Sequence, residues 1–326
     1  MSRRAAFAFV LAVIPSLSFA QSSAPWPTRP VTMVVPFAAG GPMDVVGRIM
    51  AQSLSEQLGQ QIVVENVGGG GGMTGSARVA KAAPDGYQFV LGNVGTHAVS
   101  QSLSRNPPYH VTSDFEPVAL FADLSLVLVT RKDLPASNLQ EFIAYTKANQ
   151  DKMQFASASA GSATHLGCAL LNAAIGVNVT HVPYRGGGPA MQDIVAGRID
   201  YICIDIPGVI SLIQSGDIKA LAVLSSSRAA SLPDVPTAQE QGLKGFEAAN
   251  WAAFFMPKGT PAPIVAKLQA ASSAAVDSDG VKKRMKDLGI DPVPPDRRSS
   301  AYLGTFVAGE IDKWAGPVKA SGLTTD

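Results

Sequence analysis

The chain has 326 residues, of which 46% are hydrophobic and 16% are charged, and its formal net charge is +1 at pH 7. This length predicts about two domains, and the composition excludes a disordered chain because it supplies enough apolar side chains to fill proper cores. A near-neutral charge without basic blocks argues against a nucleic-acid-binding protein.

The first twenty residues have the pattern of a cleavable signal peptide. Arg3 and Arg4 give a positive start, residues 5–14 form an apolar run, and Ser18-Phe19-Ala20 fits the small-x-small cleavage pattern. A membrane-spanning helix needs about twenty apolar residues, so this run is short for one, and an uncleaved anchor is the alternative. We expect cleavage after residue 20 and export to the periplasm.

The sequence contains two cysteines, Cys168 and Cys203. Two are too few for a disulfide framework, although an oxidising compartment would allow them to pair. Free cysteines are often buried as small apolar side chains, and this is the interpretation that we favour here.

Beyond the leader, short β-rich runs alternate with amphipathic helical runs. The run after residue 41 places Val46, Met50, Leu54 and Leu58 at i, i+4 spacing, on one face of a helix. Strands that alternate with helices predict parallel βαβ units. In this part of the chain, strands are predicted at 31–37, 61–66 and 87–93, and helices at 42–58 and through 77–80.

Two β-type runs, near 118–130 and near 246–256, are predicted to cross between two α/β sets. A chain that crosses twice makes one domain discontinuous, which indicates a hinged two-lobe α/β protein with a cleft between its lobes. We expect lobe 1 at 26–123 plus 246–326, and lobe 2 at 124–245. The remaining strands are predicted at 153–158, 179–184, 200–206, 218–225 and 251–255, and the helices at 138–149, 162–175, 261–276, 279–287 and from about 299.

Signatures of the common catalytic and cofactor sites are missing from the sequence. It has no G-x-S-x-G, H-E-x-x-H or C-x-x-C motif, and the five glycines at 68–72 lack the Lys-Ser/Thr of a phosphate loop. The histidines, His97, His110, His165 and His181, are far apart and have no acidic residues at ligand spacing. We expect no metal, no cofactor and no catalytic activity.

Two of the predicted helices begin at loops of small residues. Gly40-Gly41 precede Pro42, which suits a first helical turn, and "ASAGSATHL" at 158–166 repeats the arrangement. Glycine allows a ligand to approach the backbone, and the free N–H groups of a helix start attract anions. Two facing starts could hold a carboxylate without an arginine. The alternative is that both are ordinary, well-capped helices.

Three charged residues have two interpretations each. Asp44, in a first helical turn, either favours the helix dipole or accepts a hydrogen bond in the cleft. Asp205 ends the apolar run "YICIDIPG". A buried carboxylate there needs a partner or a ligand, although a turn cap before Pro207 is the rival. Arg185 lies beside three glycines, and we interpret it as a solvated loop charge rather than a cleft cation.

Four long stretches of the sequence are similar to one known family. They are "WPTRPVTMVVPFAAGGPMDVVGRIMAQSLSEQLGQQIVVENVGGGGGMTGSARVAKAAPDGYQFVLGN", "HVPYRGGGPAMQDIVAGRIDYICIDIPG", "IKALAVLSSSRAASLPDVPTAQEQGLKGFE" and "MPKGTPAPIVAKL". In this order they resemble the Bug family of extracytoplasmic solute receptors, the binding components of tripartite tricarboxylate transporters. The likeness covers essentially the whole mature chain.

This resemblance implies a type II periplasmic binding-protein fold, a Venus-flytrap that closes on a small solute. The family's ligands are typically carboxylates held by backbone N–H groups and waters from two loops, here residues 37–44 and 159–165. The family often has Pro-Pro-Gly-Gly in the first loop, where this chain has Ala38-Ala39-Gly40-Gly41. Together with the helix starts, the resemblance predicts these ligand-binding residues: Phe37, Ala38, Ala39, Gly40, Gly41, Asp44, Thr96, Ser159, Gly161, Ser162, Thr164, His165 and Asp205.

The predicted function is a monomeric periplasmic receptor that captures a small organic carboxylate and delivers it to the membrane permease subunits of a tripartite transporter. One alternative is a receptor whose ligand-bound state is read by a sensor protein. Another is an exported enzyme that uses the same cleft, with Asp205 or His165 as general base.

Overall fold

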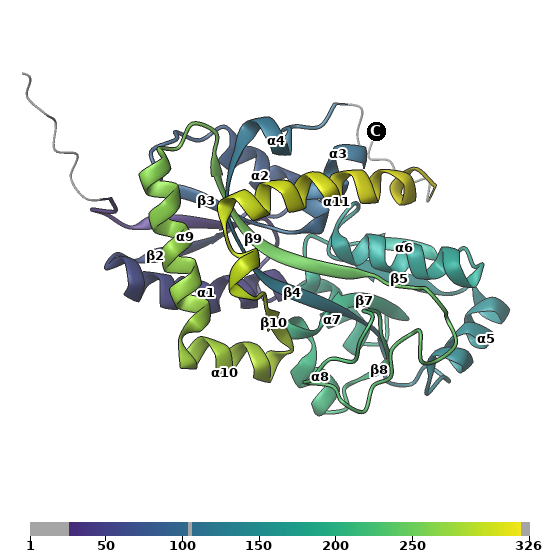
Figure 1. Cartoon of the computed structure of the whole chain (residues 1–326). Helices are drawn as coiled ribbons and strands as arrows, with labels where there is room; N and C mark the ends of the chain where they lie inside the picture. The colour runs from purple at the N-terminus through teal and green to yellow at the C-terminus, as the bar shows by residue number, and fades with distance from the viewer. Residues whose placement is uncertain (1–25, 104–105, 321–326) are drawn as a thin grey trace, which may run out of the picture.

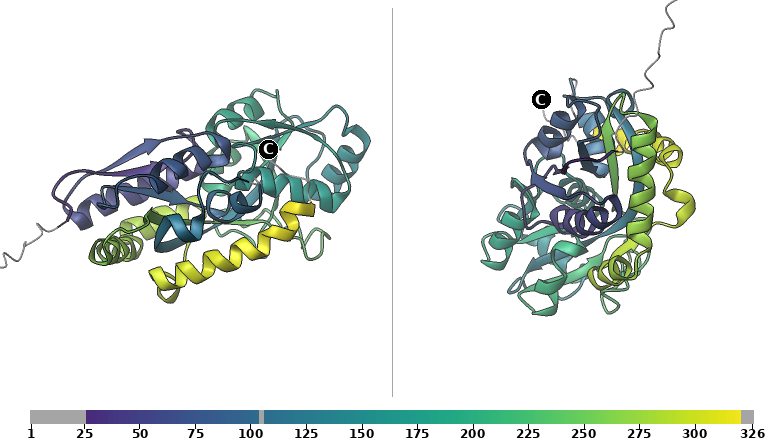
Figure 2. Two further views of the ribbon diagram at one scale, coloured as in Figure 1. Left: turned by 90° about the horizontal axis from the view of Figure 1, so that it is seen from above. Right: turned by 90° about the vertical axis from the view of Figure 1, so that its left-hand side faces the viewer.

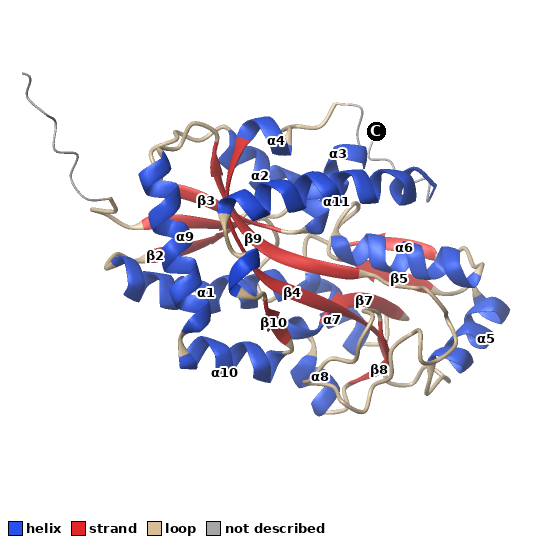
Figure 3. Ribbon diagram, in the orientation of Figure 1, coloured by secondary structure: helices blue, strands red, loops and turns tan. Residues whose placement is uncertain are grey.

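A computed structural model describes residues 26–103 and 106–320 of the chain (Figure 1). The predicted signal peptide lies outside these residues. The fold is a two-lobe α/β structure, as the sequence predicts, with strands running through the centre and helices on both faces (Figure 3). We keep the ranges given above as the proposed limits of lobe 1 and lobe 2.

The strands form one continuous sheet in the order β2-β1-β3-β9-β4-β7-β5-β6, with β10 and β8 pairing with β4 in addition. Pairing within β1–β3 and within β5–β7 is parallel, as expected for strands joined by helices, whereas β4 and β9 pair antiparallel with their neighbours. The strands are β1 Val31–Val35, β2 Ile62–Asn66, β3 Gln88–Gly92, β4 Phe115–Arg131, β5 Gln154–Ser157, β6 Thr180–Pro183, β7 Tyr201–Asp205, β8 Ile218–Val223, β9 Ala249–Pro257 and β10 Ile290–Pro292.

The longest strand, β4, joins the two lobes. It pairs with β9 as far as Ser125 and with β7 from Leu126 onward. Since β9 returns alongside it, the two strands cross together through the middle of the molecule (Figure 1). Seen from above, the lobes lie end to end along the long axis (Figure 2). Two adjacent extended strands are therefore the covalent links between the lobes in the described chain.

Each lobe buries an apolar cluster on both faces of its part of the sheet. In lobe 1, α1, α9 and α10 cover one face, and α2, α3 and α11 cover the other. The predicted stripe on α1, Val46 to Leu58, is buried against the strands because its i, i+4 spacing matches one helix face. In lobe 2, α5 and α6 cover one face, and α7 and α8 cover the other.

The structure also contains elements that the sequence patterns do not predict. The helices α7 and α8, the turns around 95–103, α4 and the strand β10 are short, and α7 and the turn at 95 begin at glycine, so their periodicity is weak. The helices are α1 Pro42–Leu58, α2 Met73–Ala80, α3 Ser100–Leu103, α4 Val111–Asp114, α5 Leu139–Asn149, α6 Ala163–Ile175, α7 Gly187–Val195, α8 Ile210–Gln214, α9 Ala262–Asp277, α10 Asp279–Leu288 and α11 Ser300–Ala320, with shorter turns η1 Gly70–Gly72, η2 Gly95–Val99, η3 Ile206–Gly208 and η4 Pro295–Arg297.

The favoured interpretation of the cysteines is wrong. Cys168 on α6 and Cys203 on β7 form a disulfide, with their Cα atoms 5.2 Å apart. Both side chains are buried, as expected, but α6 packs on β7 in lobe 2 and brings the two sulfur atoms together. A spacing of 35 residues gives no indication of this contact, because only the tertiary packing creates it.

Candidate functional site

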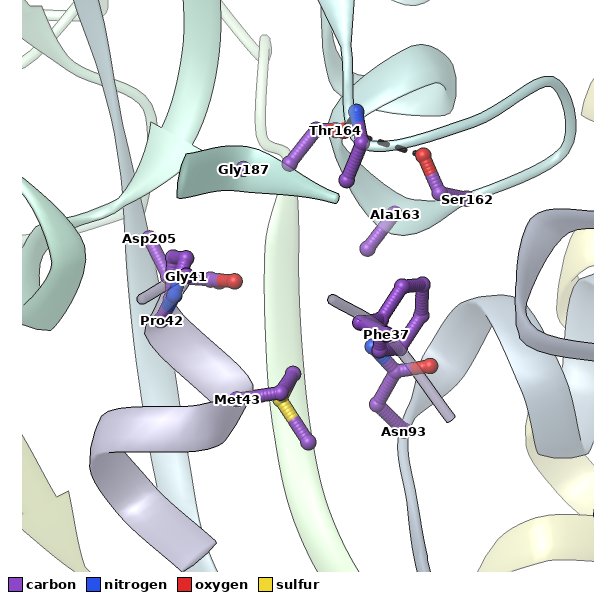
Figure 4. A pocket seen from close by; sticks show the side chains of 11 residues that line it. Phe37, Gly41, Pro42, Met43, Asn93, Ser162, Ala163, Thr164, Gly187 and Asp205 are labelled. Carbon is purple, nitrogen blue, oxygen red and sulfur yellow. Dashed lines mark hydrogen bonds between the residues drawn. The ribbon is translucent and has the colours of Figure 1, made fainter. Parts of the chain in front are cut away.

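A cavity lies between the lobes and is lined by residues of both (Figure 4). The space within it is about 300 Å³ when the open space at its mouth is included. Asp205 is the one ionisable side chain in its lining, which contains no lysine or arginine. The lining residues are Phe37, Gly41, Pro42, Met43 and Asn93 from lobe 1, and Ala158, Ser162, Ala163, Thr164, Gly187 and Asp205 from lobe 2.

The lobe 1 side of the cavity contains the start of α1. Gly41 is the N-cap residue in extended conformation, and its carbonyl accepts hydrogen bonds from the N–H groups of Asp44 and Val45. Within the residues that the structure describes, the N–H groups of Gly41 and Met43 have no hydrogen-bond acceptor. Free N–H groups in the first turn, together with the helix dipole, favour an anion at this point.

Asp44 supports the first loop from behind the cavity. Its carboxylate accepts hydrogen bonds from the Gly40 N–H at 2.9 Å, from Arg48 at 3.0 Å and from Asn66 at 3.0 Å. Burial opposes the charge on Asp44, but these hydrogen bonds outweigh it and hold the pKa of the carboxyl below its ordinary value. Asn66 also donates to the Phe37 carbonyl, so both side chains fix the path of the loop.

The lobe 2 side contains the start of α6, which is capped by its own loop. The Ser162 hydroxyl accepts from the His165 N–H and donates to the Ser159 carbonyl, and it also contacts the Thr164 hydroxyl (Figure 4). The N–H groups of Ala163 and Thr164 have no acceptor in the described part of the chain. Each helix start therefore contributes residues with unpaired N–H groups to the lining of the same cavity.

His165 lies behind this loop and holds its backbone. Its Nδ1 accepts a hydrogen bond from the Gly161 N–H at 3.0 Å, and its ring stacks on His181 with centroids 3.8 Å apart. Burial, with His181 as a second cause, lowers the pKa of His165 to about 3, and burial lowers the pKa of His181 to about 4. Both rings are therefore neutral at physiological pH, and His165 acts as an acceptor for the loop.

Asp205, at the end of β7, connects the cavity to the crossing strands. Its carboxylate, 2% exposed, accepts from the Asn250 amide on β9 at 3.1 and 3.2 Å. The side-chain oxygen of Asn250, Oδ1, in turn accepts from the Val94 N–H of lobe 1. Burial raises the pKa of Asp205 to about 7, although the hydrogen bonds from Asn250 act to lower it. This group gains or loses its proton near neutral pH.

The predicted site residues divide into three groups. Phe37, Gly41, Ser162, Thr164 and Asp205 line the cavity, whereas Asp44, Thr96, Ser159, Gly161 and His165 are not part of its lining. Thr96 is fully buried and exchanges hydrogen bonds with Asn93. Ala39 and Gly40 instead border a separate groove on the outer surface, and the Ala38 N–H donates to the Arg185 carbonyl. The Arg185 side chain is exposed, in line with a loop charge.

Six lining residues are absent from the sequence-based list: Pro42, Met43, Asn93, Ala158, Ala163 and Gly187. A signal existed for some of them. Met43 and Ala163 lie in the first turns that follow the caps Gly41 and Ser162, and first-turn amides extend beyond the cap residue. Asn93 follows β3, and ligands in α/β sheets gather at the carboxyl ends of strands. Gly187 begins a helix that the sequence pattern does not show.

The fold and the cavity define a class of protein, the two-lobe binding proteins that hold a solute between their lobes. Within the described residues, no helix has the length and apolar character to cross a membrane, and no group of three His, Cys, Asp or Glu side chains could hold a metal ion. Residues 46–323 match the family described as the tripartite tricarboxylate transporter family receptor. The chain belongs to this family, which confirms the resemblance drawn from the sequence.

Solved structures agree with this assignment. The periplasmic binding protein BugD is 40% identical, with a TM-score of 0.89, over 92% of this chain and 99% of BugD. MatC from Rhodopseudomonas palustris, solved with bound malate, is 42% identical, with a TM-score of 0.87, over 90% of this chain and all of MatC. Another R. palustris protein, solved with adipate, is 34% identical, with a TM-score of 0.87, over 91% of this chain and 98% of its own.

Proposed function

We propose that this chain is a periplasmic receptor that binds a small organic carboxylate in the cavity between its lobes and delivers it, chemically unchanged, to the permease subunits of a tripartite transporter. One observation carries the proposal: residues at two helix starts, one from each lobe, line one cavity, and the N–H groups of four of them, Gly41, Met43, Ala163 and Thr164, have no acceptor in the described part of the chain. We also propose that residues 1–20 are a cleaved signal peptide and that the receptor is a monomer.

The chemistry of the lining supports a carboxylate ligand. A carboxylate needs hydrogen-bond donors, and here the backbone can supply them without lysine or arginine. The one ionisable side chain of the lining, Asp205, is an acid and does not attract an anion. Because the lining has no lysine or arginine, the attraction for a carboxylate comes from the backbone amides. The malate and adipate in two solved relatives are small dicarboxylates, which agrees with this class of ligand.

Isothermal titration of the mature protein tests the proposal. The probes are L-malate, adipate, citrate and benzoate, and dimethyl L-malate serves as a control of similar shape without the carboxylate charge. We expect at least one of the acids to bind and the ester to fail, because the ester cannot use the charge-assisted amide contacts. Folded protein that binds none of the four acids, or that binds acid and ester alike, would contradict the proposal.

A further inference from the structure

The glycine segment 68–72, between β2 and α2, has no role in the site described so far. Gly69, Gly70, Gly71 and Gly72 all have positive φ angles, between 54° and 133°. Side chains other than glycine adopt this region at a cost, so the path of the segment depends on its composition. None of the five glycines lines the cavity. Two of them, Gly68 and Gly71, lie instead against loops of the opposite lobe.

Gly71 contacts the opposite lobe at the second ligand loop. Its N–H donates to the Ser159 hydroxyl at 2.9 Å. A Cβ atom on Gly71 would lie 2.6 Å from the Ala160 carbonyl oxygen, closer than such atoms approach in proteins. At this point the backbone of Gly71 therefore packs directly against the backbone of the opposite loop, and a residue with a Cβ atom would not fit there.

The contact continues from Ser159 to the cavity wall. The Ser159 carbonyl accepts from the Ser162 N–H at 3.1 Å and from the Ser162 hydroxyl at 2.7 Å. Ser162 caps α6 and lines the cavity. Two hydrogen bonds thus connect Gly71 through Ser159 to Ser162, the residue directly before the unpaired amides of α6, although Gly71 belongs to the other lobe.

A second contact of the same kind lies at the other end of the segment. A Cβ atom on Gly68 would lie 2.8 Å from the Arg185 carbonyl oxygen, and that same oxygen accepts a hydrogen bond from the Ala38 N–H at 3.2 Å. The glycine segment therefore meets lobe 2 at two separate loops. Neither contact needs a ligand atom.

We propose that Gly71 is a positioning residue for ligand binding, which holds the Ser159–Ser162 turn in place across the cleft when the lobes are closed. The inference rests on the proposed function, because it assigns to that site a contact that sets affinity without touching the ligand. Closure and ligand affinity are linked, since a ligand held by both lobes binds the closed form. Weakening the contact at Gly71 therefore weakens binding.

The chain offers a matched pair of variants, Gly71→Ala and Gly70→Ala. Both glycines are in the left-handed region, with φ of 69° and 54°, so alanine costs similar backbone strain at each. The nearest atom to a Cβ on Gly70 is the Thr74 hydroxyl oxygen of its own lobe, 3.7 Å away. The variants therefore differ in one respect, the collision with the opposite lobe.

Titration with the acid that the wild-type protein binds most tightly gives the first measurement. We expect Gly71→Ala to bind at least tenfold more weakly, with faster dissociation, and Gly70→Ala to stay within threefold of the wild type. Equal affinities for the two variants would overturn the inference. A wild-type protein that binds no acid contradicts the proposed function instead, so the two failures are distinguishable.

Hydrogen exchange gives a second measurement that does not depend on the ligand. We expect Gly71→Ala to speed amide exchange in residues 158–166 of the opposite lobe more than Gly70→Ala does. Faster exchange confined to residues 67–76 would show a local effect and overturn the inference.

If both alanine variants fail to fold, Ser159→Ala removes the hydroxyl acceptor without backbone strain. It leaves the carbonyl of residue 159 free to hold Ser162. The same weakening of affinity is expected, and unchanged affinity would contradict the inference.

Discussion

Asp205 shows how burial changes the chemistry of a single residue. Its carboxyl has one hydrogen-bonding side chain, Asn250, and no cation shares the cavity lining with it. Burial raises the pKa of this carboxyl from 3.8 to about 7 in the folded protein. The sequence identifies Asp205 as a buried acid at a strand end, but its raised pKa comes from the burial that the folded chain creates around it, and the hydrogen bonds from Asn250 oppose that rise.

This raised pKa predicts a pH-dependent difference between the wild type and Asp205→Asn. Between pH 4 and 7 the unfolded chain ionises Asp205 while the folded chain keeps the proton, so the folded state binds more protons and its stability falls as pH rises. The free energy of unfolding of the wild type, relative to Asp205→Asn, should fall by up to about 4 kcal/mol across this window and level off above pH 7.

Urea denaturation of both proteins at pH 4, 5, 6, 7 and 8 measures this difference. Comparing the two proteins cancels the contributions of the buried histidines, whose pKa values of about 3 to 4 affect both alike. A difference that stays constant from pH 4 to 8 would show that Asp205 is ionised in the fold at all of these pH values.

At the scale of elements, the two helix starts at the cavity differ in how they are capped. The helix α6 has a side-chain cap from Ser162, whereas α1 begins at Gly41 without one and is held by the Asp44 carboxylate and Pro42. The sequence predicts both starts from their glycines and small polar residues. It does not show that the two starts line the same cavity. That depends on how β4 and β9 cross between the lobes and place residues 41 and 163 on opposite walls.

A comparison of two caps separates stability from binding. Ser162 accepts from the His165 N–H at the start of α6, and Asn138 accepts from the Glu141 N–H at the start of α5, away from the cavity lining. We expect Ser162→Ala and Asn138→Ala each to lower the free energy of unfolding by about 1 kcal/mol. Only Ser162→Ala should also weaken carboxylate binding, several-fold, because it loosens a loop of the cavity.

Denaturation and titration of both variants provide the measurements. The Asn138 variant controls for the general effect of losing a helix cap. If both variants bind with wild-type affinity, the start of α6 has no part in holding the ligand, and the role proposed for the Ala163 and Thr164 amides fails.

At the scale of the whole molecule, the cavity that we propose as the ligand site has walls from both lobes, and β4 and β9 are the strands that join the lobes. A ligand that contacts both walls stabilises the two lobes together. We expect saturating acid, at a hundredfold excess over its dissociation constant, to add about 2.7 kcal/mol to the free energy of unfolding. This should raise the melting temperature by several degrees in one cooperative transition.

Differential scanning calorimetry with and without the acid measures this effect, with dimethyl L-malate as the control ligand. Two resolved transitions, only one of them shifted by the acid, would mean that the ligand is held by a single lobe. That outcome would contradict a site built from both helix starts.

The sequence by itself determined the alternation of strands and helices, the two crossings and the capped helix starts. These features depend on local periodicity and on glycine, proline and small polar residues at particular positions. The family resemblance added the expected class of ligand. Val46 to Leu58, for example, are buried as predicted because their spacing alone puts them on one helix face.

Only the tertiary structure decided which atoms meet across long separations in the chain. It paired Cys168 with Cys203, placed Asp44 behind the first loop rather than in the cavity lining, and joined Asp205 to Asn250 on the crossing strand. It also set Gly71 against Ser159, 88 residues away. Such contacts follow from how the sheet and the lobes pack, and local sequence patterns cannot predict them because they reflect only residues that are near one another in the chain.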